Sequence, residues 1–226
     1  IYLLTFILIN LIIYLKKDFF ISRYNIYDLP DKNRKQHHVQ ISVFGGAIIL
    51  INLFVLLVLI FVLDLKFPEF VNNNRNLFSI FFISTMVFLI GLSDDKLLIN
   101  NISKFISLLI LIFLSVLVDN DIIIENIKFS FMSREILLLN FSLIFTVLCI
   151  LSFMNAYNFL DGIDLLCGTY AFIIFLIFFI LTKSLFFIPL IFSLIVFCIL
   201  NYKKKLFLGD SGALLISFLI SIFMIK

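Results

Sequence analysis

The stretch ISVFGGAIILINLFVLLVLIFVL, residues 41–63, decides the fold class, because it runs from Ile41 to Leu63 without a charged side chain. An α-helix needs about 20 mostly apolar residues to cross the roughly 30 Å hydrocarbon core of a bilayer. The stretch is long enough for one such crossing. It therefore predicts a transmembrane helix, and similar apolar runs recur along the rest of the chain.

The composition of the whole chain agrees with this interpretation and excludes other broad classes. Of 226 residues, 63% are hydrophobic and only 14% are charged, and the mean hydropathy is +1.23, which excludes a soluble domain. The 31 Phe fall in runs without polar alternation, which excludes a transmembrane β-barrel. The net charge of +3 is too small to indicate nucleic acid as a partner. We expect an all-α, polytopic helical membrane protein.

Cutting the chain where charges cluster gives about eight expected transmembrane helices in a single integral-membrane domain, residues 1–226. The expected spans are residues 1–15, 41–63, 77–92, 102–118, 136–154, 165–181, 185–200 and 213–225. We expect the middle of each span to consist almost entirely of Ile, Leu, Phe and Val, with only isolated Ser and Thr as polar residues. Cys149, Cys167 and Cys198 stand alone inside apolar runs, so we expect reduced thiols without a redox or metal role.

Basic residues are distributed unequally between the two faces that these crossings define. One face is formed by loops 16–40, 93–101, 155–164 and 201–212. Counting Lys104 at the edge of the second loop, it has eleven basic residues: Lys16, Lys17, Arg23, Lys32, Arg34, Lys35, Lys96, Lys104, Lys203, Lys204 and Lys205. The other face has five: Lys66, Arg75, Lys128, Arg134 and Lys183. By the positive-inside rule the first face is cytoplasmic. With no cleavable signal pattern, we expect a multi-pass protein of the cytoplasmic (inner) membrane.

Acidic residues show a second asymmetry. The same cytoplasmic loops hold eight Asp and no Glu, whereas Glu69, Glu125 and Glu135 all fall on the opposite face. Carboxylates are costly near lipid and contribute little to topology, so membrane anchoring does not explain short acidic side chains beside helix ends. A site for a cation explains them.

Two motifs supply most of these acidic side chains. In GLSDDK, residues 91–96, the adjacent Asp94 and Asp95 suit proton abstraction or a place beside a metal, and equally a solvated loop balanced by Lys96. In NAYNFLDGID, residues 155–164, oxygen-bearing side chains recur every third residue, at Asn155, Asn158, Asp161 and Asp164. On a helix that spacing places the first three along one face, where they offer oxygen ligands for Mg²⁺ and acceptors for a nucleotide.

Two further motifs carry glycine and basic residues. FLGDSG, residues 207–212, places Asp210 between two glycines that let backbone approach a ligand closely, and Gly212 is expected to open the last span. The preceding Lys203–Lys205 run favours an anchor to anionic lipid. RKQHH, residues 34–38, precedes Gly45 and Gly46, whose simplest explanation is close helix packing.

The charged side chains of the RKQHH motif fit phosphate chemistry. Arg34 and Lys35 match the donors that a diphosphate needs, while the spacing of His37 and His38 favours ordinary loop residues over catalytic ones. Together the four cytoplasmic loops indicate a Mg²⁺-dependent site for a phosphorylated, nucleotide-bearing substrate and a partner held in the bilayer.

GLSDDK, NAYNFLDGID, FLGDSG and RKQHHVQISVFGG resemble the four cytoplasmic signatures of the polyprenyl-phosphate N-acetylhexosamine-1-phosphate transferases. This superfamily includes phospho-N-acetylmuramoyl-pentapeptide transferase, in glycosyltransferase family 4. The Arg-Lys-x-His element followed by Gly-Gly is most similar to the branch that transfers N-acetylglucosamine-1-phosphate to undecaprenyl phosphate. The resemblance implies Mg²⁺-dependent transfer of a sugar-1-phosphate from a UDP-sugar to a polyprenyl phosphate, with release of UMP. It also implies a first membrane step in making a cell-envelope polysaccharide such as lipopolysaccharide.

The resemblance also implies roles for individual residues. Asp210 would be the principal metal ligand with Asn158 as its companion, and Asp94 and Asp95 would face the lipid phosphate. The remaining implied substrate-binding residues are Asn155, Asp161, Asp164, Lys104, Arg34, Lys35 and His37. The residues leave open whether transfer occurs in one step or through an enzyme-bound intermediate. They also leave open the sugar, the lipid chain length, the polymer and whether the chain forms a homodimer.

Two other functions are alternatives to the sugar-phosphate transferase. An intramembrane Mg²⁺-dependent prenyltransferase would need two Asp-rich clusters, and only Asp161–Asp164 approaches one. A transporter or flippase would need polar residues in the middle of its spans. Because spans 1–15 and 213–225 are short, we expect the chain to be incomplete at both ends. The family resemblance implies a further His-containing cytoplasmic loop after Lys226.

Overall fold

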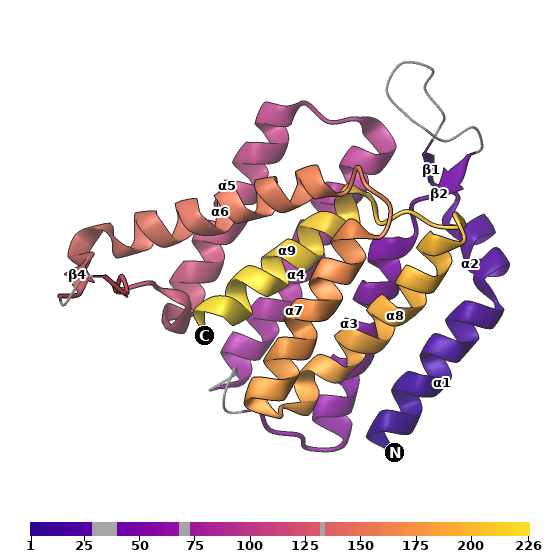
Figure 1. The fold of residues 1–226 in the computed structure, drawn as a ribbon, viewed down its shortest axis with the longest axis horizontal. Helices are drawn as coiled ribbons and strands as arrows, with labels where there is room; N and C mark the ends of the chain where they lie inside the picture. Colours follow the sequence, from indigo (N-terminus) through magenta and orange to yellow (C-terminus); the bar gives the residue numbers. More distant parts are fainter. Residues whose placement is uncertain (29–39, 68–72, 132–133) are drawn as a thin grey trace.

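The computed structural model describes residues 1–28, 40–67, 73–131 and 134–226, and almost all regular structure in them is α-helix (Figure 1). Within these ranges the α-helices are α1 Tyr2–Leu15, α2 Lys17–Tyr24, α3 Gly45–Val62, α4 Asn74–Leu97, α5 Asn101–Val118, α6 Ser142–Leu160, α7 Leu166–Thr182, α8 Ile188–Tyr202 and α9 Gly209–Ile225. The predicted all-α class is confirmed. The three cysteines are free thiols in this structure.

Short strands and 3₁₀ turns connect the helices. Strand β1 (Tyr27–Asp28) pairs antiparallel with β2 (Ile41–Ser42), and β3 (Asn126–Ile127) pairs with β4 (Ile136–Leu137). Three 3₁₀ helices lie at Asn120–Ile122, Leu139–Phe141 and Leu185–Phe187. The β3–β4 hairpin and the first turns of α6 project from the side of the bundle in Figure 1.

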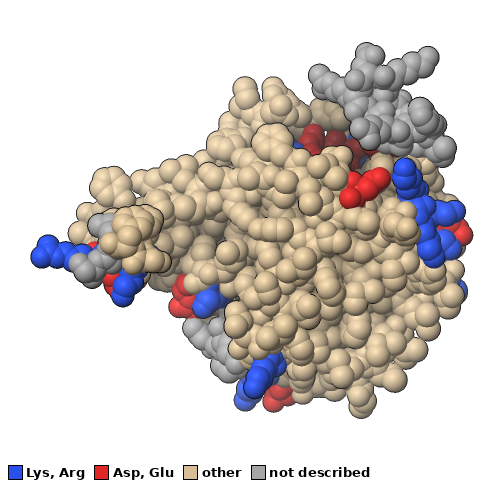
Figure 2. Space-filling view, viewed as in Figure 1, with Lys and Arg blue, Asp and Glu red and all other residues tan. Residues whose placement is uncertain are grey.

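Eight of the helices are apolar enough to be membrane spans. Five helical segments are also long enough, namely Gly45–Val62, Asn74–Leu97, Asn101–Val118, Leu139–Leu160 and Leu185–Tyr202. The shorter apolar helices are α1, α7 and α9. Figure 2 shows most of the charged atoms of this face toward the edges of the molecule, with a broad uncharged surface between them. The chain is therefore a multi-pass membrane protein whose apolar helices correspond one for one to the eight predicted spans.

Helix α9 is the central element of the bundle. All residues from Ser211 to Phe223 are buried, and the helix packs against α3, α4, α6 and α7. A helix that is apolar on every side fits a position enclosed by other apolar segments, and the neighbouring helices provide that enclosure for α9. At its far end Lys226 forms a 2.6 Å ion pair with Asp119, which also accepts a hydrogen bond from Asn76 of α4.

Four predicted spans are wrong by four to six residues at one end or both. Helix α3 begins at Gly45 instead of Ile41, where the chain is still in strand β2. Helix α4 continues through the acidic motif to Leu97 instead of ending at Leu92. Helix α6 begins at Ser142 instead of Ile136, because residues 136–137 pair with β3, and it extends to Leu160. Helix α9 begins at Gly209, so Gly212 does not open it. As a consequence, the acidic motifs lie on helix ends more than in loops.

The prediction that the spans contain only isolated Ser and Thr is also wrong. Asn10 of α1 and Asn52 of α3 are 4% and 0% exposed and form an amide pair inside the bundle. The Asn10 Nδ2 donates to Asn52 Oδ1 at 2.8 Å, and the Asn52 Nδ2 donates to Asn10 Oδ1 at 3.3 Å. Each amide also donates to a carbonyl of its own helix. The pair fixes the register of α1 on α3.

Replacing Asn52 with Leu should destabilise the protein by about 1 kcal/mol, because it leaves the buried Asn10 amide without its cross-helix partner. The double variant Asn10→Leu/Asn52→Leu should recover most of this loss, since no unpaired amide remains. Thermal unfolding in detergent measures both. If the double variant lost as much stability as Asn52→Leu and Asn10→Leu together, the pairing would be contradicted.

Candidate active site

Two ion pairs join three helices at one end of the bundle. The Lys104 ammonium, in the first turn of α5, donates to Asp94 Oδ2 of α4 at 2.8 Å and also to Asp210 Oδ2 of α9. The second oxygen of Asp94 accepts from the Ile99 backbone N–H at 2.9 Å. The side chains of Asp94 and Lys104 are 14% and 12% exposed, whereas Asp210 is 30% exposed. Asp210 is therefore the member of the group most open to a ligand.

Asp95 has a different environment from its neighbour Asp94. Its Oδ1 accepts from the Asp210 backbone N–H at 2.8 Å, and its Oδ2 accepts from the Ser211 N–H at 3.0 Å. These amides belong to the first turn of α9, where N–H groups have no partner within the helix. The Asp95 side chain of α4 thus caps the N-terminus of α9, and its negative charge is stabilised by the positive end of the α9 helix dipole. Asp95 holds the backbone of Asp210 in place.

Glycines allow these helix ends to approach one another. A Cβ on Gly91 would lie 2.5 Å from Ser211 Cα, and one on Gly46 would lie 2.6 Å from the Gly212 nitrogen. Gly209 has φ +74°, a left-handed conformation that favours glycine, and an added Cβ would lie 1.9 Å from Val43 Cγ1. The close-packing explanation of Gly45 and Gly46 is therefore the one that the geometry supports.

The segment before α3 is hydrogen-bonded to the segment before α9. Gly45 N–H donates to Phe207 O at 3.0 Å, Gly46 N–H donates to Leu208 O at 3.2 Å, and Phe207 N–H donates to Ser42 O at 2.8 Å. These backbone bonds fix the Gly-Asp-Ser-Gly turn on the Gly-Gly start of α3. Two motifs that are distant in the sequence therefore form one structural unit.

The third acidic motif faces the same unit. Asn158, in the last turn of α6, has a buried Oδ1 that finds no hydrogen-bond partner within the described ranges. Burial, followed by the negative charges of Asp210 and Asp95, raises the pKa of the Asp161 carboxyl to about 8. The backbone N–H of Gly209 opposes this shift. Asp94, Asp95, Asp161 and Asp210 therefore lie close together at this end of the bundle, with the Lys104 ammonium among them.

The remaining predicted site residues have no hydrogen bond or ion pair to Asp94, Lys104 or Asp210 within the described ranges. Asn155 lies half-buried on α6, and Asp164 is exposed in the turn after it. Arg34, Lys35 and His37 lie outside the described residues.

Two residues that the sequence analysis did not single out also support the site. Asn201 at the end of α8 accepts from the Leu165 N–H at 2.8 Å and donates to Leu206 O at 2.8 Å, so it ties the α6–α7 turn to the turn before α9. Tyr24 of α2 has a buried hydroxyl, and burial raises its pKa, with the nearby Asp95 charge adding to the shift. No sequence pattern marks either residue, because their roles depend on contacts between distant segments.

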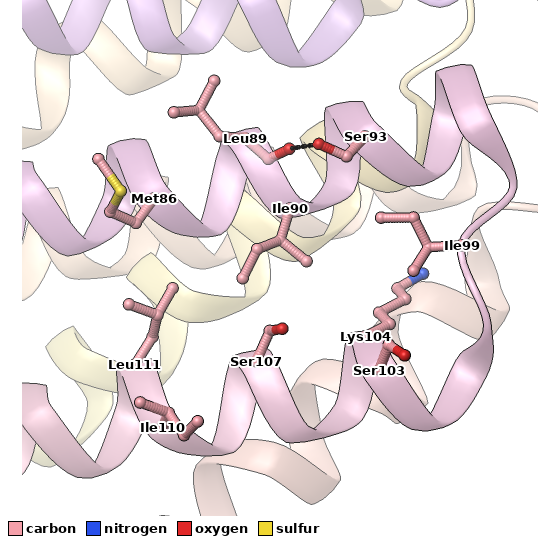
Figure 3. Close-up of a pocket in the computed structure, with 10 residues that line it drawn as sticks. All are labelled: Met86, Leu89, Ile90, Ser93, Ile99, Ser103, Lys104, Ser107, Ile110 and Leu111. Carbon is pink, nitrogen blue, oxygen red and sulfur yellow. Dashed lines mark hydrogen bonds between the residues drawn. The ribbon is translucent and has the colours of Figure 1, made fainter.

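An apolar groove of about 390 Å³ leads away from this site between α4 and α5 (Figure 3). Lys104, Ser103 and Ser93 lie toward one end of the groove, and Met86, Leu89, Ile90, Ile110 and Leu111 line its length. The polar end adjoins the ion pairs, while the rest of the lining is apolar except for the Ser107 hydroxyl. Such a groove fits a molecule with an anionic head and an aliphatic chain.

The donor set fits Mg²⁺ better than a soft metal. No group of three or more His, Cys, Asp or Glu forms a metal cage within the described ranges. Mg²⁺ commonly takes one or two protein oxygens and completes its shell with waters and substrate phosphates. The exposed Asp210 carboxylate and the partnerless Asn158 oxygen are such donors.

These features define a class, a polytopic membrane protein with a carboxylate-rich site at one end of its helices and an apolar groove beside it. Residues 77–226 match the family model described as glycosyl transferase family 4, and the chain belongs to that family. It is accordingly a membrane transferase, and the transporter alternative is set aside. The matched region runs from the first turn of α4 to the end of α9 and hence contains every site carboxylate discussed above. A search of the curated proteins finds no match.

Proposed function

We propose that this chain transfers N-acetylglucosamine-1-phosphate from UDP-N-acetylglucosamine to a polyprenyl phosphate such as undecaprenyl phosphate, as the first membrane step of a cell-envelope polysaccharide pathway. Membership of glycosyl transferase family 4 supports the general reaction, sugar phosphate transfer to a lipid carrier. The single observation that carries the proposal is the position of Lys104, which touches Asp94 and Asp210 and also lines the apolar groove. A lipid phosphate at Lys104 with its chain in the groove would meet the site carboxylates.

The acceptor side of the reaction is assigned to α4 and α5. Lys104 would bind the lipid phosphate by exchanging its contact with Asp210 for a phosphate oxygen, because an ammonium has three donors and a flexible stem. Asp94 would accept a proton from that phosphate and keep Lys104 oriented. Asp95, with both oxygens on α9 amides, acts as a positioning residue for Asp210.

The donor side is assigned to α6, α9 and the basic loop. Asp210 and Asn158 would hold Mg²⁺, which when bound screens the repulsion between the two anionic substrates and stabilises charge on departing UMP. Asn155, Asp161 and Asp164 would contact the ribose and uracil. Arg34, Lys35 and His37 would contact the diphosphate, where guanidinium and ammonium donors match phosphate oxygens.

The chemical step exchanges one phosphoanhydride bond for another. In direct transfer, an oxygen of the lipid phosphate forms a bond to the phosphorus that carries the sugar. The bond from that phosphorus to the bridging oxygen breaks, and the bridging oxygen leaves with UMP. A lipid diphosphate sugar results, and the proton removed from the acceptor phosphate is held by Asp94 until it reaches water.

A transfer assay tests this function. Purified protein with undecaprenyl phosphate, Mg²⁺ and radiolabelled UDP-N-acetylglucosamine should form a labelled lipid, and EDTA should abolish the product until Mg²⁺ is restored. UDP-glucose serves as the matched donor without the acetamido group. Full activity in EDTA would contradict the metal assignment, and labelling from every UDP-sugar except UDP-N-acetylglucosamine would contradict the donor.

We also propose that the site faces the cytoplasm of the inner membrane, since nucleotide sugars are made there and the basic residues are concentrated on that face. In a variant whose three native cysteines are replaced, a cysteine at Leu97, which is 72% exposed, should react with an impermeant thiol reagent only after the membrane is opened. A cysteine at the exposed Lys128 should react in intact cells. The reverse labelling pattern would overturn the orientation.

A further inference from the structure

A second apolar groove lies between α1 and α8. Its volume is about 290 Å³, and Ile7 and Leu11 of α1 and Ile195 and Ile199 of α8 are among the residues that line it. It shares no lining residue with the groove between α4 and α5. Both helices are spans of a membrane protein, so the groove is open to the hydrocarbon chains of lipids.

Tyr14 lies at one end of this groove with two lysines around it. The Lys203 ammonium, just after α8, donates to the Tyr14 hydroxyl at 2.9 Å and lies 5.3 Å from the ring centroid. The Lys17 ammonium, at the start of α2, lies 5.9 Å from the same centroid. Both distances are within the range of cation–π attraction. Two cations from separate helices are thus held at the polar mouth of an apolar groove.

The surroundings of the mouth are strongly basic. The segments Lys16–Tyr24 and Lys203–Lys205 contain six basic residues, Lys16, Lys17, Arg23, Lys203, Lys204 and Lys205, and one acidic residue, Asp18. Asp18 is 3.6 Å from Lys17 and is largely exposed. Basic side chains at the end of transmembrane helices attract anionic lipid headgroups, and an apolar groove directly below them accommodates a chain.

We propose that the α1–α8 groove binds an anionic glycerophospholipid. Its phosphate would lie between the Lys17 and Lys203 ammonium groups with the Tyr14 hydroxyl as an additional donor. One acyl chain would follow the groove along Ile199, Ile195, Leu11 and Ile7. The charge of the mouth selects an anionic head over a zwitterionic one, and the apolar lining of the groove selects a lipid over a free phosphate. This site is independent of the transfer reaction.

The absence of Trp from the sequence allows a direct test, because one introduced Trp is the only indole fluorophore. Ile195→Trp, or Ile199→Trp if the first variant does not fold, places the reporter in the groove. The protein is reconstituted in vesicles of phosphatidylcholine containing either dibrominated phosphatidylglycerol or dibrominated phosphatidylcholine at equal mole fraction. Phosphatidylglycerol should quench the groove Trp with an apparent affinity about fivefold or more above that of phosphatidylcholine.

Three controls separate a site from general attraction. Ile173→Trp, on the 53% exposed position of α7, should show no preference between the two brominated lipids. In the groove reporter, Lys17→Gln/Lys203→Gln should reduce the preference to near one, whereas Lys204→Gln/Lys205→Gln removes the same charge without touching Tyr14 and should leave most of it. Unbrominated undecaprenyl phosphate at stoichiometric amounts should not relieve the quenching.

Several results would overturn the proposal. Equal quenching of the groove Trp by both lipids would show that the groove has no headgroup selectivity. Equal loss in the two double-lysine variants would mean that diffuse surface charge is responsible. Relief of quenching by stoichiometric undecaprenyl phosphate would make the groove a site for the polyprenyl acceptor instead of a phospholipid.

Discussion

Asp210→Asn should lower the transfer rate at least about 100-fold while the protein still inserts and folds. The substitution keeps the side-chain volume and removes the charge of the most exposed carboxylate in the ion-paired group. Loss of a charged group that stabilises a phosphoryl-transfer site typically costs two or three orders of magnitude in rate. The rate of labelled lipid formation at saturating substrate measures the effect.

The matched control is Asp64→Asn, which makes the same chemical change at an exposed carboxylate in the loop after α3. Asp64 has a positive φ of 48°, a conformation that Asn tolerates well. We expect wild-type activity from this variant. An Asp210→Asn protein that retains wild-type transfer at ordinary Mg²⁺ would remove Asp210 from the metal site.

Gly91→Ala should reduce activity more than tenfold and lower thermal stability by about 1–3 kcal/mol. A Cβ at this position would lie 2.5 Å from Ser211 Cα and 2.6 Å from Ser211 N, so the contact is with backbone and cannot be relieved by a rotamer change. The first turn of α9 must therefore move away from α4. That movement separates Asp95 from the two amides it accepts.

Gly162→Ala is the matched control for this effect, because nothing lies within 4 Å of the position that its Cβ would occupy. It adds the same methyl group in the turn beside Asp161 and should leave both the unfolding temperature and the transfer rate near wild type. If Gly91→Ala behaved like Gly162→Ala, the close α4–α9 contact would not be required for the site.

The eight apolar helices could be predicted from the sequence because each is a long run of residues that only hydrocarbon or a buried core can solvate. Their ends could not be. Asp94 and Asp95 look like loop residues in isolation, but α4 continues through them because Lys104 and the α9 amides satisfy their charges. That compensation comes from other helices, and no local pattern records it.

The candidate site could also be predicted in part from the sequence. The motifs predicted that Asp94, Asp161 and Asp210 lie at one end of the helices, and the family resemblance added Lys104. In the structure these four residues lie together at that end. The different partners of Asp94 and Asp95 could not be predicted from the sequence. Adjacent residues on a helix point in different directions, and the partners of these two lie on α5 and α9. The Asn10–Asn52 pair was missed because each Asn is a single polar residue within an apolar run.

The identity of the released nucleotide tests the central proposal most directly. Transfer of a sugar-1-phosphate to a polyprenyl phosphate breaks the diphosphate and releases UMP, whereas transfer of the sugar alone leaves the diphosphate intact and releases UDP. Chromatography of the nucleotides after incubation of purified protein with UDP-N-acetylglucosamine, undecaprenyl phosphate and Mg²⁺ distinguishes the two. We expect UMP in a one-to-one ratio with the labelled lipid; UDP as the product would contradict the proposed reaction.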